Sequence, residues 1–108
     1  MEFFEVINTR HSIRTFHPTP IEPEKLEQIL QTINRAPSAG NRQAYEVYLV
    51  QDAPRKEAFV QAAGGQEFLA QAPLVLVFCA HPALSQVRYA QRGETLYTIQ
   101  DATIACTY

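Results

Sequence analysis

The stretch Arg10-His11-Ser12-Ile13-Arg14 decides how the rest of this chain is interpreted. Two arginines four positions apart, with a serine hydroxyl between them, can converge on one anion, because each planar guanidinium offers paired donors that match phosphate oxygens. His11 adds a ring nitrogen. A solvated basic turn at the end of a first helix is the alternative interpretation, since short motifs also occur by chance.

A second stretch, Ala36-Pro37-Ser38-Ala39-Gly40-Asn41-Arg42-Gln43, breaks both the helical and the strand period and is predicted to be a loop. Proline, serine, glycine and asparagine in close succession offer backbone donors in unusual conformations, and Asn41 and Gln43 add side-chain amides. Such a loop can simply connect two elements, or it can line a polar, planar ligand. Its presence favours the anion-binding interpretation of residues 10–14.

Length and charge limit the possible functions. At 108 residues the chain is one domain or less, and an apolar fraction of 46% is ordinary for a soluble globular protein. A net charge of −2 argues against bulk attraction to nucleic acid or to an anionic membrane, so any anion site must be local. The chain shows neither a bilayer-spanning apolar run nor a signal peptide. We therefore expect a cytoplasmic protein that binds neither nucleic acid nor a membrane.

The two cysteines, Cys79 and Cys106, are far apart in apolar surroundings and have no close-spaced partner. Metal ligands and redox pairs are usually closely spaced, so this arrangement predicts thiols in the core and no metal site.

Apolar spacing predicts the elements of the first half. A short helix is expected to end near Thr9, followed by an extended, proline-punctuated segment over residues 17–23. A helix of about three turns should begin at Pro23, because apolar residues then recur every three or four positions up to Ile33.

Two strands are predicted, over residues 45–51 and 74–80, each covered on both faces. Between them, Asp52 is expected to cap a helix that ends at Gly64-Gly65, and residues 66–72 should form a further helical turn. The apolar side of the capped helix is predicted to consist of Ala58, Phe59, Ala62 and Ala63.

The last third is predicted to be a loop or loose helix followed by a buried helix. Residues 82–93 are polar, and Arg88 and Arg92 are expected to be solvated. Residues 94–108 are apolar or small on nearly every side, so this helix should be buried in a core or between subunits, Tyr97 and Tyr108 included. No cap follows it, and we expect the chain to be a truncated or shortened form of a longer protein.

These motifs, in this order and spacing, resemble the N-terminal half of the nitroreductase family of flavin enzymes. The resemblance covers nearly all of residues 1–108, which would form a partial domain ending after the central helix. It implies an α+β fold with a central, mostly antiparallel sheet flanked by helices, and an intertwined homodimer with FMN at the subunit interface. The matching segments are 10–14, 36–43, the strand from Tyr45, 72–80 and 100–105.

The resemblance also implies residue roles. Arg10, Ser12 and Arg14 match the residues at the phosphate and ribityl end of FMN, with His11 contributing from the same loop. A second group matches the loop that reaches the flavin from the other subunit: Pro37, Ser38, Ala39 and Asn41. Gln66 matches a polar contact to the flavin ring or ribityl chain. No catalytic residue is assigned, because the first hydride transfer needs no protein acid or base.

The expected function is an FMN-dependent oxidoreductase. It would take a hydride from NAD(P)H and pass it to a small-molecule acceptor, such as a nitroaromatic or a quinone, in a ping-pong scheme. The family's second half supplies a contact near flavin N5, a basic contribution to the phosphate and much of the sheet, and it has no counterpart in these residues. Other members of the fold break down flavin, remove halogen from an aromatic ring, or oxidise peptide heterocycles.

Two alternatives from other classes stay open. One is a non-catalytic dimerisation or interaction module, in which the apolar helix 94–108 docks to a partner. The other is a small phosphate- or nucleotide-binding domain without redox activity, for which the cluster at 10–14 would suffice.

Overall fold

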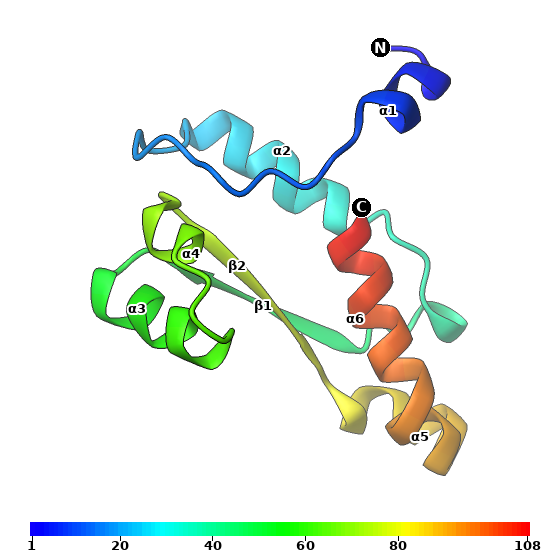
Figure 1. Ribbon diagram of the computed structural model, residues 1–108. Coiled ribbons are helices and arrows are strands. Elements are labelled where there is room, and N and C mark those ends of the chain that lie inside the picture. Colours follow the sequence, from blue (N-terminus) through cyan, green and yellow to red (C-terminus); the bar gives the residue numbers. More distant parts are fainter.

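Two antiparallel strands and six α-helices make up the computed structural model, which describes residues 1–108 (Figure 1). A 3₁₀ turn at Ala39–Asn41 and a π-helical segment at Gly93–Tyr97 complete the elements. The helices and strands are, in order, α1 (Phe3–Thr9), α2 (Pro23–Ile33), β1 (Tyr45–Val50), α3 (Ala53–Ala62), α4 (Phe68–Gln71), β2 (Val75–Ala80), α5 (Pro82–Arg92) and α6 (Thr98–Thr107).

Most element positions confirm the sequence predictions. Pro23 occupies the first turn of α2, where its missing N–H has no helical partner to lose. The Asp52 carboxylate caps α3 by accepting the N–H of Arg55 at 3.1 Å. Gly64 and Gly65 end that helix with φ angles of +72° and +86°, which side chains disfavour.

The sheet separates an apolar face from a partly polar one. Residues of β1 and β2 pair in antiparallel register from Tyr45 with Ala80 to Val50 with Val75. Directly opposite residues point to the same side, so every second pair shares one face. The face that carries Tyr45, Val47 and Phe78 packs against a small core formed by three residues, Ile33, Ala36 and Ala105. In Figure 1, α6 lies beside this sheet, and contacts join it to both strands.

The prediction that both strands are covered on both faces is wrong for this chain. Tyr48 and Leu49 of β1 are 53% and 44% exposed, and no residue of β2 is fully buried. Each strand of a two-stranded sheet has one edge without a neighbouring strand. In this chain, few residues pack against the second face of the sheet, so that face stays partly exposed. The apolar run of each strand therefore predicted the position of the strand correctly, but not how deeply its side chains are buried.

Residues 94–108 are not buried in a core of the single chain, which was one of the two places predicted for them; burial between subunits stays a prediction. Leu96, Ile99 and Tyr108 are 44%, 55% and 61% exposed. The side of α6 that faces the protein instead carries small and polar residues: Thr98, Asp101, Ala102 and Ala105.

Neither cysteine is the core thiol predicted from the sequence, because Cys79 is half-buried and Cys106 is exposed. Cys106 lies on α6, whose outer side carries no cover in the chain. Cys79 lies on β2, a strand of the thin two-stranded sheet.

The packed side of α3 differs from the prediction too. Val60 is completely buried, whereas Ala58 and Ala62 are exposed. The buried side of α3 is hard to recognise in the sequence because it includes the charged residue Lys56, one turn before Val60. Lys56 is half-buried, and its ammonium donates to the Ala72 carbonyl at 2.8 Å. Long lysine stems can cover apolar surface in this way.

Residues 82–92 form a helix whose backbone breaks at Ala90, where φ is 49° and ψ is −135°. Arg88 and Arg92 are exposed and form no ion pair, as predicted. Tyr97 is half-buried and packs edge-to-face against Tyr89, with ring centroids 5.0 Å apart.

The N-terminal segment lies at the periphery. No residue of α1 is buried, and the helix stands apart from the sheet in Figure 1. The chain then runs without helix or strand to Glu22 and contacts α4, where the rings of Phe16 and Phe68 lie 6.1 Å apart. None of the helices is long and apolar enough to cross a lipid bilayer.

Candidate functional site

The basic stretch 10–14 follows α1 directly and is exposed throughout. The side chains of Arg10, Ser12 and Arg14 make no hydrogen bond or ion pair within the chain. His11 is held locally, with its Nδ1 2.8 Å from the Thr9 carbonyl oxygen. Two guanidinium groups and a hydroxyl without internal partners are free to donate to an anion such as phosphate.

The loop 37–43 is held in an unusual backbone conformation. Gly40, Asn41 and Gln43 have φ angles of 56°, 53° and 48°. Left-handed backbone costs roughly 1–2 kcal/mol for a residue with a side chain. A Cβ at position 40 would collide with the Tyr89 hydroxyl, so the loop and α5 approach closely at this glycine. Such a conformation persists only if neighbouring contacts hold it.

Contacts inside the loop and to α5 supply part of that support. The Ser38 hydroxyl accepts the Gln43 N–H at 2.9 Å, which closes the loop on itself. The Arg42 guanidinium donates to the Leu84 carbonyl of α5 at 2.9 Å. Pro37 and Asn41 stay exposed, and the Asn41 amide has no hydrogen-bond partner. The outer side of the loop therefore keeps a free amide for a ligand.

The remaining support comes from α6, which sequence reasoning had not singled out as part of the site. The Ala39 N–H donates to Asp101 Oδ1 at 3.0 Å, across a separation of 62 residues. The Thr98 hydroxyl donates to the Ala44 carbonyl at 2.7 Å. The sequence signal was weak, because Thr98 and Asp101, which lie three positions apart on one side, are two of five polar residues in α6.

Gln66 follows α3, whereas the loop 37–43 precedes β1, and no hydrogen bond or ion pair joins the two. The Gln66 amide donates to the Ala63 carbonyl at 3.1 Å and so serves the end of α3.

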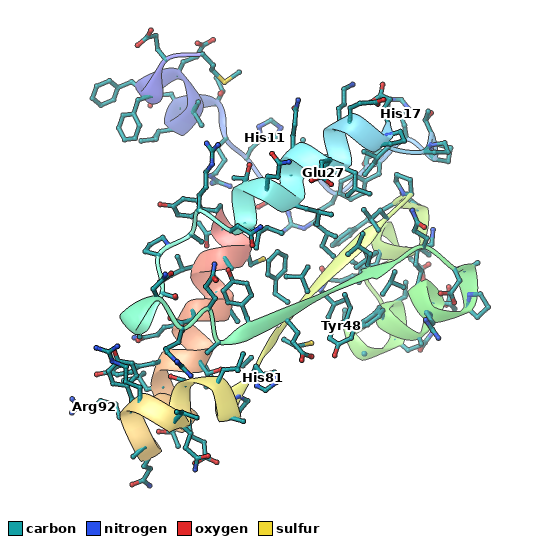
Figure 2. All side chains as sticks on the ribbon, turned by 180° about the vertical axis from the view of Figure 1, so that it is seen from behind. His11, His17, Glu27, Tyr48, His81 and Arg92 are labelled. Atoms are coloured by element: carbon teal, nitrogen blue, oxygen red, sulfur yellow. The ribbon has the colours of Figure 1, made fainter.

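The structure does not bring the predicted cofactor residues into one cluster within a single chain. No hydrogen bond or ion pair joins residues 10–14 to the loop 37–41. In Figure 2, His11 lies at the end of the molecule that carries α1 and α2, and Arg92 at the opposite end.

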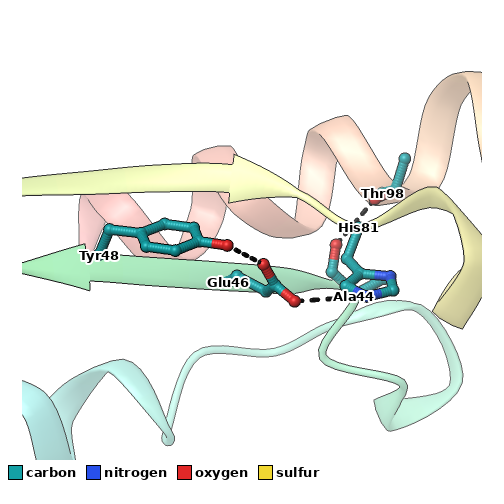
Figure 3. A network of polar contacts seen from close by, with 5 residues as sticks. All are labelled: Ala44, Glu46, Tyr48, His81 and Thr98. Carbon is teal, nitrogen blue, oxygen red and sulfur yellow. Dashed lines mark hydrogen bonds and ion pairs between the residues drawn. The ribbon is translucent and has the colours of Figure 1, made fainter.

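A separate polar network lies on the second face of the sheet (Figure 3). The Tyr48 hydroxyl donates to Glu46 Oε2 at 2.5 Å, and His81 Nε2 lies 3.4 Å from Glu46 Oε1. The hydrogen bond to Glu46, reinforced by the negative charge of that carboxylate, raises the pKa of Tyr48. This network includes none of the predicted cofactor residues.

Two apolar cavities also lie away from those residues. The larger, of about 570 Å³, runs between β2 and α6, and Phe59 of α3 closes one side. The smaller, of about 350 Å³, lies between residues 16–21 and the segment from α4 to β2. Neither is lined by a predicted cofactor residue, so the largest cavity does not mark the candidate site.

Comparison with known proteins decides the family. The sequence model of the nitroreductase family matches residues 7–63, which include both the basic stretch and the loop 37–43. The chain belongs to the nitroreductase family. As a nitroreductase-family chain it has the α+β fold expected from the sequence, and the structural relatives below share that fold.

Three relatives illustrate the similarity. An FMN reductase (NAD(P)H) of Bacillus subtilis is 39% identical over 79 residues, which are 73% of this chain and 32% of that protein. The NADPH:FMN oxidoreductase of Vibrio harveyi, solved in complex with NAD⁺, is 27% identical with a TM-score of 0.83, covering 96% of this chain and 47% of that one. A nitroreductase family protein of Clostridium novyi is 28% identical with a TM-score of 0.83, covering 99% of this chain and 60% of that one.

The chain therefore spans less than two thirds of each of these relatives.

Proposed function

We propose that this nitroreductase-family protein is an FMN-dependent oxidoreductase. It takes a hydride from NAD(P)H and passes it to a small-molecule acceptor such as a nitroaromatic or a quinone, in a ping-pong scheme. The observation that carries this proposal is the basic stretch 10–14, in which Arg10, Ser12 and Arg14 have no partner within the chain. The names of two relatives, an FMN reductase and an NADPH:FMN oxidoreductase, support the cofactor and the donor.

The residues present fit the phosphate end of FMN. A phosphate dianion needs several strong donors, and two free guanidinium groups with a hydroxyl between them provide these. His11 adds a ring nitrogen from the same stretch. Bound FMN would supply the ring that exchanges the hydride, and the chain's own residues would bind and orient it.

We assign the loop 37–41 to the flavin of a second copy. Its Pro37 and Asn41 side chains are exposed and uncommitted, while Ser38 and Ala39 shape the backbone. A site shared by two chains is what the resemblance to the family implies for this loop. The exposed apolar side chains of Leu96 and Ile99 further support a homodimer, because soluble proteins rarely leave such patches uncovered. The role of Gln66 at the flavin stays part of the proposal.

The spectrum of the purified chain tests the proposal. After incubation with FMN and gel filtration, flavin absorption should elute with a species of dimer size, and NAD(P)H should then bleach it. A chain that remains colourless at every elution volume would contradict FMN binding by these 108 residues.

The same exposed side chains, Leu96 of the π-helical segment and Ile99 of α6, also favour a second candidate, a non-catalytic dimerisation or interaction module. That function requires self-association or partner binding without flavin. A dimer-sized, colourless species that FMN does not stabilise would favour it. Binding of other nucleotides as tightly as FMN would instead favour a phosphate- or nucleotide-binding domain.

A further inference from the structure

One face of α6 holds both ends of the segment 39–44. Asp101 accepts the N–H of Ala39 at 3.0 Å, and Thr98 donates to the carbonyl of Ala44 at 2.7 Å, the bond drawn in Figure 3. Thr98 and Asp101 are 0% and 2% exposed. Residues three apart on a helix are neighbours on its surface, so the two side chains form a clamp on the loop.

The Asp101 end of the clamp is the unusual one. Thr98 satisfies its end with a neutral hydroxyl, whereas Asp101 brings a carboxylate into the interior, and its Oδ2 has no hydrogen-bond partner. Burying a carboxylate with so few partners is unfavourable. What the carboxylate gains is a charge-assisted bond, which is stronger than one to a neutral acceptor.

The loop explains why a strong acceptor is placed there. Directly after Ala39 come Gly40 and Asn41, both with left-handed backbone, and Gln43 repeats that conformation. A released loop would relax toward ordinary φ angles and move the Asn41 amide. Because the Ala39 N–H points inward to Asp101, the outer side of the loop is left to present Asn41.

We infer that Asp101 is a positioning residue for flavin binding. It does not touch the cofactor, but it fixes the conformation in which the loop 37–41 presents its exposed groups. The inference rests on the proposed function for its flavin part. The holding of the loop by Asp101 can be measured without flavin.

The test compares the 108-residue chain with three single variants in two assays. Amide hydrogen exchange over residues 37–43 is followed without flavin, and the FMN dissociation constant is measured by flavin fluorescence. Asp101→Ala removes the acceptor, and Asp101→Asn keeps an acceptor oxygen of the same shape. Val60→Ala is the matched control, because Val60 is equally buried but lies in α3, at the other end of the strand.

Asp101→Ala should speed exchange over 37–43 and weaken FMN about tenfold or more, as expected for the loss of a bond to a charged group. Asp101→Asn keeps an acceptor oxygen but loses the charge, so it should fall between the wild-type chain and Asp101→Ala in both assays. Val60→Ala should melt earlier but bind FMN normally.

A fourth variant removes the donor instead of the acceptor. Ala39→Pro lacks the N–H, and proline is compatible there because Ser38 is extended, with φ −144° and ψ 158°. If both residues act through one bond, Ala39→Pro should weaken FMN as Asp101→Ala does, and the double variant should lose no more than either single one. If Asp101→Ala folds poorly, the Ala39→Pro single variant still tests whether this bond supports FMN binding.

Wild-type FMN affinity in Asp101→Ala, or an equal loss in Val60→Ala, would overturn the inference. Additive losses in the double variant would overturn it too. If the wild-type chain binds no FMN, the proposed function fails for this chain, and so does the inference that Asp101 supports flavin binding. Exchange then still decides whether Asp101 holds the loop, since unchanged protection in Asp101→Ala would refute that.

Discussion

Replacing Arg10 and Arg14 together by alanine should abolish most FMN affinity without unfolding the chain. Both side chains are exposed and make no internal hydrogen bond or ion pair, so the free energy of unfolding should change by less than about 0.5 kcal/mol. A charge-assisted bond contributes about 1.5–3 kcal/mol. Two such contacts to one phosphate give roughly 3–6 kcal/mol, which weakens FMN by about a hundredfold or more.

Titration of flavin fluorescence measures this loss. The double variant Lys25→Ala/Arg55→Ala is the control, because it removes the same net charge from two exposed positions in α2 and α3. Riboflavin is the matched ligand, since it lacks the phosphate and should bind the wild-type chain and the Arg10/Arg14 variant equally. Unchanged FMN affinity in the Arg10/Arg14 variant would refute the phosphate assignment. An equal loss in the control would mean that general charge, not this site, attracts FMN.

Three further changes test the fold and one polar contact. Asp52→Ala removes the cap of α3 and should lower the free energy of unfolding by about 1 kcal/mol in urea denaturation, whereas an unchanged midpoint would contradict the cap. Gly93→Ala would place a Cβ 2.6 Å from the Ser85 carbonyl oxygen and should cost about 1–3 kcal/mol, so a wild-type melting temperature would contradict this packing. The hydrogen bond to Glu46 raises the pKa of Tyr48, so its contribution to stability is present at neutral pH and is lost as pH rises through that raised pKa. In an ultraviolet titration, Glu46→Gln should form tyrosinate at lower pH than the wild-type chain, and coincident curves would refute the contact.

The positions of the elements could be predicted because their signals are local. Pro23 and Asp52 start helices, and Gly64 ends one, through backbone effects confined to a few residues. The apolar run before Ala80 gave β2 in the same way. The loop at 37–43 was predictable for the converse reason, since its residues favour turns and interrupt every period.

Burial could not be predicted, because it depends on what lies opposite each element. Val60 is buried while Ala58 is exposed, because the side of α3 that carries Lys56 and Val60 faces the protein, where Lys56 donates to the Ala72 carbonyl. Periodicity gives the relative positions of side chains around an element. It does not say which neighbours, or how many strands, will cover them.

The candidate site was predictable in its exposed parts and not in its support. Residues 10–14 and Asn41 stand out because their chemistry suits an anion or a flavin edge. The bond from Ala39 to Asp101 joins positions 62 residues apart, and no local pattern encodes such a pairing. The polarity of Thr98 and Asp101 did not single them out, because α6 also carries Gln100, Thr103 and Thr107.

That polarity also explains how α6 can serve the fold and the proposed function together. An ordinary surface helix turns apolar residues inward and polar ones outward. In α6 the buried side carries Thr98 and Asp101, which hold the loop, while Ile99 is 55% exposed and lines the cavity between β2 and α6. If a second copy covers the exposed apolar side chains of Leu96 and Ile99, as we propose, flavin binding and self-association should rise together with chain concentration. If FMN affinity proved independent of chain concentration, the loop and the arginines would have to act within one copy, and the shared site would be wrong.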